Sequence, residues 1–161
     1  IKDLKMIQFI LLVSRHGKIR LSKWYNTFSN KEREKIMKDV KTMVIGRNSK
    51  LCNFLEYRDY TIVAKRYASL YFVACVDKED NELLVLDVIH FFVEVLDKYF
   101  KNVCELDIIF NFHKAYYILD EMIVGGHIIE TSKKQIHRVI VNQDSLMEEA
   151  KEEAVPKRNR K

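Results

Sequence analysis

Three acidic side chains in the second half of the chain are of a residue type that performs general acid–base catalysis. They are Asp107, Asp120 and Glu121. Carboxylates on amphipathic helices usually cap a helix or pair with lysines at the surface, and we expect that role here. The chain contains no G-x-S-x-G, P-loop or G-x-G-x-x-G motif, and its four glycines offer little material for a phosphate-binding loop. The sequence therefore indicates a protein that is not an enzyme, with no catalytic residues and no cofactor.

The histidines and cysteines do not have the spacing of a metal site. None of the five histidines has a cysteine or carboxylate partner at ligand spacing, so we expect structural or surface roles for them. The cysteines Cys52, Cys75 and Cys104 are odd in number and lie in apolar surroundings. They lack the paired spacing of a disulfide framework, so the sequence predicts reduced thiols and no bound metal.

The formal net charge of +5 permits anionic partners without selecting one. Binding of nucleic acid requires basic residues interleaved with exposed aromatic residues, and the nearest match is Lys65-Arg66-Tyr67. Tyr67 falls in an alternating strand pattern, where packing is its expected role, so we expect no nucleic-acid partner. The chain also lacks an uncharged apolar run of about 18 residues, so no membrane-spanning helix is predicted.

The length and composition predict one folded domain. The chain has 161 residues, of which 48% are hydrophobic, and this is sufficient for one well-filled core. We expect an N-terminal extension over 1–5, a domain over 6–153 and a basic, disordered tail over 154–161. Met6 is the expected native start.

The first half of the chain predicts a hairpin and a helix. Apolar runs at 7–13 and 19–25 flank a turn that contains Gly17. In the second run, a period of two places Ile19 and Leu21 on the buried face and points Arg20 outward. A capping box at Ser29–Glu32 then begins a helix that Gly46 ends, with Ile36, Val40, Met43 and Val44 on one face. Three further strands are predicted at 54–57, 60–67 and 70–76.

The second half predicts helices. Asp80 or Asn81 caps a helix that continues to Phe100, and its two adjacent apolar rows exceed what one small sheet can cover. We therefore expect this helix to contact another polypeptide. A further helix is expected from Glu105 to Val124, with a break near Asn111, and Gly125-Gly126 ends it. Thr131 or Ser132 caps a last amphipathic helix. Strands joined by short turns and followed by helices indicate an α+β fold with an antiparallel sheet.

Polar residues in the segment Asn102–Phe112, NVCELDIIFNF, have spacings that core packing alone does not require. This segment and several others resemble the small, or sigma, subunit of clathrin adaptor complexes over residues 6–140. The segments are KIRLSKWY (18–25), KRYASLYF (65–72), DNELLVLDVIHFFVEVLDKYFKNVCELDIIFNF (80–112), AYYILDEMIVGG (115–126) and IETSKK (129–134).

The resemblance implies a longin-like fold, in which helices flank a five-stranded antiparallel sheet. It also implies a heterotetramer in which this chain contacts a large, gamma-type adaptin directly, together with a beta-type adaptin and a medium subunit. Clathrin and a small GTPase would be indirect partners. The implied location is cytoplasmic, at the periphery of trans-Golgi network and endosome membranes and on clathrin-coated vesicles.

The resemblance further implies a site for acidic dileucine sorting signals, which have the form acidic-x-x-x-Leu-Leu/Ile. Arg20 matches the arginine that attracts the acidic residue. The residues that match the leucine pockets and their polar rim are Ala68, Leu70, Val93, Asn102, Val103 and Ile108. Composition alone would assign Val93 and Val103 to the core. Two buried leucines and one charged contact, less the ordering of a flexible tail, predict micromolar affinity, or about −8 kcal/mol.

Two alternatives remain open. The strings LLVSRHGK (11–18), LDKYF (96–100) and ILDE (118–121) look most like the type-one complex, whereas NFLEYRDYTI (53–62) and ACVD (74–77) resemble the plasma-membrane, type-two complex. A function of a different class is also compatible with the element order: a stand-alone longin-type regulator of small GTPases or membrane fusion.

Overall fold

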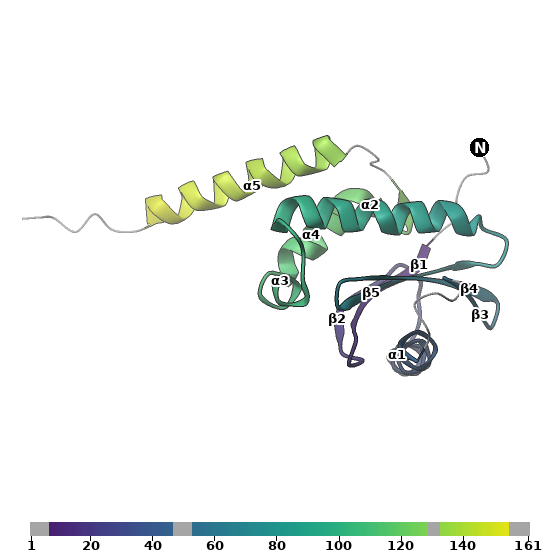
Figure 1. Ribbon diagram of the computed structural model, residues 1–161. Coiled ribbons are helices and arrows are strands. Elements are labelled where there is room, and N and C mark those ends of the chain that lie inside the picture. The colour runs from purple at the N-terminus through teal and green to yellow at the C-terminus, as the bar shows by residue number, and fades with distance from the viewer. Residues whose placement is uncertain (1–6, 47–52, 129–132, 155–161) are drawn as a thin grey trace, which may run out of the picture.

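The computed structural model describes residues 7–46, 53–128 and 133–154 and shows a five-stranded antiparallel sheet between two layers of helices (Figure 1). The strand order is β2-β1-β5-β4-β3. The strands are β1 (Ile7–Ser14), β2 (Ile19–Trp24), β3 (Phe54–Tyr57), β4 (Tyr60–Tyr67) and β5 (Leu70–Asp77). Helix α1 (Asn30–Ile45) covers one face, and α2 (Glu82–Phe100) covers the other. The expected α+β fold and the five strands are confirmed.

Strand β1 lies inside the sheet, and its position explains why its sequence is almost continuously apolar. All eight of its residues are buried. Phe9, Leu11 and Val13 pack on the side of α1, in what we call the α1-side core. Ile10 and Leu12 pack on the side of α2, in the α2-side core. A strand covered on both faces has no solvent side, so strict polar–apolar alternation is absent.

Strand β2 contains a β-bulge that the period of two did not predict. Leu12 pairs with Leu21 and Val13 pairs with Ile19, so Arg20 is the extra residue between them. Leu21 consequently packs in the α2-side core and Ile19 in the α1-side core. The prediction that Ile19 and Leu21 share a face was therefore wrong, because one additional residue reverses the alternation.

The predicted helix starts are confirmed where the structure describes them. In α1, the Glu32 amide donates to the Ser29 hydroxyl over 3.3 Å, and the Ser29 amide donates to the Glu32 carboxylate over 2.8 Å. In α2, the Asn81 side chain accepts from the Leu83 amide over 3.0 Å. These three hydrogen bonds satisfy amides that have no partner within the helix. The cap expected at Thr131 or Ser132 lies outside the described residues.

The apolar rows of α2 are covered largely by helices of the same chain. Helix α4 (Phe112–Met122) and helix α5 (Lys133–Ala154) both pack against α2, and Ile136 and Ile140 of α5 are buried in the α2-side core. Of the described α2 residues, Leu83 is the large apolar side chain that stays exposed. The prediction that one small sheet could not cover α2 is confirmed. The sequence did not identify α4 and α5 as the elements that pack over it.

The expected long helix from Glu105 to Val124 is instead two helices and a hairpin. Helix α3 (Glu105–Phe110) and α4 meet at Asn111, and α4 ends at Met122 rather than at the glycines. Strands β6 (Ile123–Val124) and β7 (His127–Ile128) follow. Gly125 and Gly126 both have positive φ, +57° and +86°, which suits a tight hairpin turn. The Ile7 amide donates to the Gly126 carbonyl over 2.9 Å, so the turn of this hairpin is hydrogen-bonded to the start of β1.

Helix α5 begins over α2 and α4 and then projects away from the body (Figure 1). The second half of α5 exposes Leu146 and Met147. Its last described helical residue is Ala154, which was expected to belong to the tail. Of the described helices, none has the length and apolar composition needed to cross a membrane.

Candidate functional site

The structure gathers the predicted site residues at the end of the sheet where α2 turns into α3. Arg20 lies on β2, Val93 on α2 and Ile108 on α3. Ala68 forms the turn between β4 and β5, Leu70 begins β5, and Asn102 and Val103 connect α2 to α3. Helix α3 packs against β2, and the Arg15 amide donates to the Ser69 carbonyl over 3.1 Å. Segments that are far apart in sequence therefore meet at this end.

The apolar members of the set are buried in the α2-side core. Leu70 and Ile108 are 0% exposed, Val103 is 2% exposed and Val93 is 4% exposed. The assignment of Val93 and Val103 to the core from composition is confirmed. Ala68 and Asn102, in contrast, are exposed at the surface. The four apolar residues that the resemblance matches to leucine pockets are thus packed in the core, and a ligand side chain could reach them only if neighbouring side chains moved.

Arg20 is partly buried and paired with an acidic residue. Its Nε donates to Oε1 of Glu105, at the start of α3, over 2.8 Å, and the two side chains are 25% and 22% exposed. The prediction of a cationic side chain directed away from the strand's core residues is compatible with this position. The sequence did not predict the internal carboxylate, although Glu105 is one of the residues whose spacing core packing leaves unexplained.

Helix α4 holds β2 in place next to this pair. The Tyr116 hydroxyl accepts from the Ser22 amide over 2.9 Å and donates to the Ser22 carbonyl over 3.0 Å. Lys23 pairs with Asp120 over 2.9 Å. The open edge of β2 is therefore bonded to a side chain, which fixes the strand that carries Arg20.

The connection from α2 to α3 reverses direction through two residues with positive φ. Lys101 has φ +55° and Asn102 has φ +73°, a conformation that costs a lysine more than an asparagine. Asp97 stabilises the reversal, because its Oδ1 accepts from the Val103 amide over 3.0 Å. The same oxygen accepts from the Tyr67 hydroxyl over 2.9 Å, and this hydrogen bond raises the pKa of Tyr67.

The sequence did not predict the roles of Asp97 and Tyr67, and only packing was expected of Tyr67. The sequence position of Asp97 did indicate that its side chain needs a partner. A carboxylate in the last turn of a helix faces the negative end of the helix dipole, so its position needs another stabilising partner. Here the partners are a backbone amide and a tyrosine hydroxyl, and the result is a fixed backbone at Asn102 and Val103.

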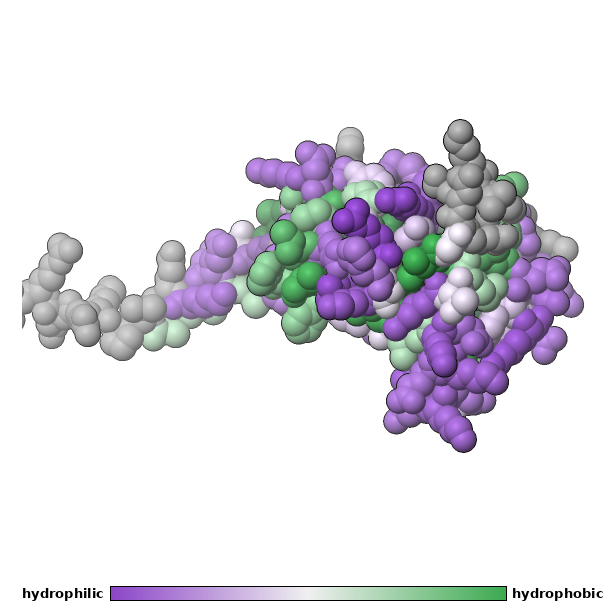
Figure 2. All heavy atoms as spheres, turned by 60° about the horizontal axis from the view of Figure 1, so that its bottom comes forward, coloured by the Kyte–Doolittle hydropathy of each residue, from purple (hydrophilic) through white to green (hydrophobic). Residues whose placement is uncertain are grey.

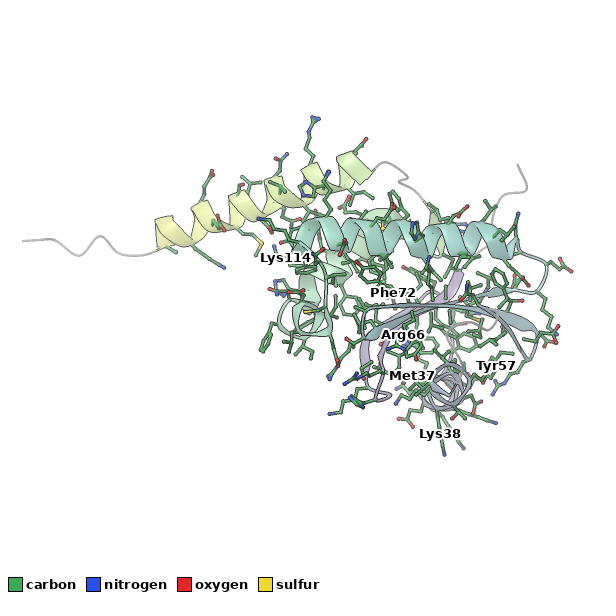
Figure 3. The ribbon with its side chains drawn as sticks, viewed as in Figure 1. Met37, Lys38, Tyr57, Arg66, Phe72 and Lys114 are labelled. Carbon is green, nitrogen blue, oxygen red and sulfur yellow. The ribbon has the colours of Figure 1, made fainter. Side chains whose placement is uncertain are left out.

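The turn at Ala68 is held by the preceding strand. Ala68 has φ +52°, and its carbonyl accepts from Nε of Arg66 over 3.2 Å. The Arg66 guanidinium also lies over the Tyr71 ring, at 5.8 Å from the ring centroid. Figure 3 shows Arg66 on the α1 side of the sheet and Phe72 between the sheet and α2. The basic residue thus stabilises the turn from the face opposite to the α2-side core.

The acidic residues that could have served acid–base catalysis have structural partners. Asp107 accepts from the Cys104 amide over 2.9 Å and caps α3. Asp120 pairs with Lys23, as described above, and Glu121 accepts a hydrogen bond from Tyr117. The capping and lysine-pairing roles expected for Asp107 and Asp120 are confirmed.

The structure also bears on the histidines and cysteines. Within residues 7–46, 53–128 and 133–154, no group of three metal-ligating side chains forms. His90 pairs with Glu94 on α2, Nε2 to Oε1, over 3.2 Å. Cys75 and Cys104 are free, and burial raises the pKa of the Cys75 thiol well above its ordinary value. Cys52 lies outside the described residues.

Sequence comparison identifies the family. The model of the clathrin adaptor complex small chain family matches residues 6–147. The chain belongs to this family. It is 62% identical to AP-1 complex subunit sigma-2 of Dictyostelium discoideum over 87% of this chain and 91% of that protein. It is 59% identical to AP-1 complex subunit sigma-2 of Arabidopsis thaliana, over 92% of both chains. It is 54% identical to human AP-1 complex subunit sigma-1A, over 89% and 91%.

Structural comparison agrees. A chain in a homology model of the full-length AP-3 complex in a stretched open conformation matches with a TM-score of 0.71 and 30% identity, covering 92% of this chain and 99% of that one. The small chain described here is therefore a sigma subunit of a clathrin adaptor complex, a component of vesicle transport. The family is one of trafficking components and is not a known enzyme family.

Proposed function

We propose that this small chain, together with a large adaptin, binds acidic dileucine sorting signals of membrane cargo. The observation that carries the proposal is a partly buried cation, Arg20, held beside a core end to which β5, α2 and α3 all contribute. A signal of the form acidic-x-x-x-Leu-Leu/Ile needs a cation and an apolar pocket at a fixed separation. The fixed backbone at Asn102 and Val103 supplies a rigid rim for such a pocket.

The closed state of the site affects the expected affinity. Burial of two leucine side chains stabilises a complex by about 1.5 to 3 kcal/mol each, and the charged contact adds about 1.5 to 3 kcal/mol. Ordering the cargo tail and moving side chains around Val93 both subtract from this gain. Micromolar binding, or about −8 kcal/mol, stays the prediction for the assembled complex.

Exposed apolar residues near the site support an obligatory partner. Leu106 and Phe110 of α3 are 60% and 74% exposed, and Phe112 of α4 is 55% exposed. Figure 2 shows hydrophobic side chains gathered on the side of the molecule from which α5 projects. Neighbouring apolar side chains of this size are typical of an interface. We assign this surface to the large, gamma-type adaptin, with the beta-type adaptin and the medium subunit completing a heterotetramer.

The type-one complex is the assembly that the relatives favour, since the three reported above are all AP-1 sigma subunits. The corresponding location is peripheral, on trans-Golgi network and endosome membranes and on clathrin-coated vesicles, with clathrin and a small GTPase as indirect partners. The plasma-membrane, type-two complex is the alternative. Copurification with large adaptins from native cytosol, identified by mass spectrometry, distinguishes the two assemblies. A small chain that recovers no adaptin at all would favour the stand-alone longin-type regulator.

The test of the site uses the assembled complex and peptides with and without the two leucines. Val93→Asp is a poor probe, because a carboxylate at a position that is 4% exposed would destabilise the fold itself. Ala68 is exposed in a turn at φ +52°, where both Asp and Asn are tolerated. We expect Ala68→Asp to weaken peptide binding at least about tenfold and the Ala68→Asn control much less. Equal binding by both variants and the unmodified complex would place the peptide elsewhere.

A further inference from the structure

Glu105 is already paired with Arg20, the cation that a sorting signal would need. The carboxylate and guanidinium belong to residues 85 positions apart, and they meet only because α3 packs against β2. A ligand carboxylate that approaches Arg20 therefore finds an internal carboxylate already bound. This inference rests on the function proposed above, and it concerns the selectivity of that site and its affinity for acidic peptides.

Capping of α3 does not explain the position of the Glu105 side chain. A carboxylate at the start of a helix often accepts from the first free amides. In α3 this role is filled by Asp107, whose Oδ2 accepts from the Cys104 amide over 2.9 Å. The Glu105 side chain instead extends across to β2 and contacts Arg20. Its position thus follows from the pairing with Arg20 and not from the needs of the helix end.

The geometry of the pair lets an incoming carboxylate approach Arg20 but not share it with Glu105. Glu105 uses the single Nε–H donor. In the part of the chain that the structure describes, no hydrogen bond engages the four N–H donors at the two Nη atoms of Arg20. These donors form the end of the guanidinium that binds a carboxylate through two parallel hydrogen bonds. A second carboxylate there would lie close to Glu105, however, and like charges at such separation repel.

We propose that Glu105 is a specificity-determining residue that competes with the acidic residue of the signal for Arg20. Binding then exchanges one ion pair for another and does not create a new one. The exchange lowers the affinity for acidic peptides and makes that affinity depend little on salt, since the number of ion pairs is the same before and after binding. Peptides that lack the acidic residue do not disturb the pair and are unaffected by Glu105.

The variant Glu105→Gln separates charge from shape. The glutamine carbonyl can still accept from Nε of Arg20, so the guanidinium keeps its orientation while the competing charge is lost. Both side chains are partly exposed, and Asp107 still caps α3, so the variant should assemble with its adaptin partners. The second variant, Arg20→Gln, removes the cation and serves as the reference for binding that depends on the leucines alone.

The experiment measures the binding of two synthetic peptides to the reconstituted complex at low and high salt. One peptide has the pattern Glu-x-x-x-Leu-Leu, and the other has Gln in place of Glu. We expect Glu105→Gln to strengthen binding of the acidic peptide at least about threefold at low salt, to steepen its salt dependence and to leave the Gln peptide unchanged. In Arg20→Gln, the acidic peptide should bind no more tightly than the Gln peptide, because the cation is gone and the charge of Glu105 remains.

Each other outcome has a defined meaning. If the acidic peptide binds the Glu105→Gln complex no more tightly than the unmodified complex, or if both peptides gain equally, competition by Glu105 is refuted while the site itself stands. If the unmodified complex binds neither peptide, and loss of the leucines makes no difference, the proposed function fails and this inference fails with it.

Discussion

Tyr99 of α2 donates its hydroxyl hydrogen to Asp144 of α5, and Lys114 of α4 forms an ion pair with the other oxygen of the same carboxylate. One acidic side chain thereby joins three helices beyond the face of the sheet. Figure 3 shows Lys114 close to the end of α2 that lies near α5. Burial and the hydrogen bond to Asp144 together raise the pKa of Tyr99, so its hydroxyl stays a donor throughout the physiological range.

Replacing Asp144 with Asn should loosen α5 from the body. The substitution removes the charge that Lys114 pairs with and should cost about 1 to 2 kcal/mol of docking free energy, because the group is only partly buried. Hydrogen–deuterium exchange of the α5 amides in the assembled complex measures this change. Asn142→Ala, at an exposed position on the same helix, is the control. Unchanged exchange in Asp144→Asn would show that apolar contacts alone hold α5.

The same contact predicts that acid weakens the attachment of α5 to the body of the protein. Burial raises the pKa of Asp144, but hydrogen bonds from Lys114 and Tyr99 outweigh it and leave the pKa below the ordinary value of 3.8. A carboxyl whose folded pKa is lowered stabilises the fold fully above its unfolded pKa and loses this contribution as the pH falls through the folded value. The stability difference between the unmodified chain and Asp144→Asn should therefore be constant from pH 7 to about pH 5 and shrink toward pH 2. A difference that grows on acidification would contradict the assignment.

Asp97→Ala should reduce peptide binding without unfolding the chain. The Asp97 carboxylate holds the Val103 amide and the Tyr67 hydroxyl, and without it the backbone at Asn102 and Val103 is less ordered. We expect a loss of roughly fivefold to tenfold in affinity for a dileucine peptide. Tyr67→Phe is the matched control, because it removes one partner of Asp97 and keeps the Val103 contact. It should therefore have the smaller effect, and the reverse order would mean that the tyrosine hydroxyl carries the role.

Lys101→Gly should stabilise the small chain. Lys101 ends α2 at φ +55°, a conformation that glycine adopts without steric cost. Relief of the strain should raise stability by about 0.5 to 1 kcal/mol, offset in part by the greater freedom of glycine in the unfolded chain. Thermal unfolding of the chain with its large adaptin measures the shift. Lys101→Val should lower the melting temperature, because a β-branched side chain is least compatible with positive φ.

Much of the fold was predictable because its signals are local. The capping box at Ser29 and Glu32 and the cap at Asn81 depend on residues within one turn, and both are present as expected. The hairpin turn at Gly17 and the strand boundaries of β3, β4 and β5 depend on equally short patterns. Such signals are read correctly because no distant contact competes with them.

The differences come from contacts that sequence spacing does not reveal. The glycines at 125 and 126 have the sequence expected of a helix end, but pairing of Gly126 with Ile7 of β1 draws this segment into a hairpin. The pairs Arg20–Glu105 and Tyr67–Asp97 likewise join segments at least 30 residues apart. The resemblance to a known family supplied the set of candidate site residues, whereas the partners that fix or oppose them become visible only in three dimensions.

The bulge in β2 has a consequence for how this chain can change. If Arg20 were deleted, Ile19 would still face Val13 and Leu21 would still face Leu12, since these pairs are already in register on either side of it. The hairpin is therefore complete with one residue fewer, and its hydrophobic side chains would keep their present cores. The strand pairing accommodates Arg20 as an extra residue and does not depend on it, so a change at this position would act through the ion pair with Glu105 and not through the register of the hairpin.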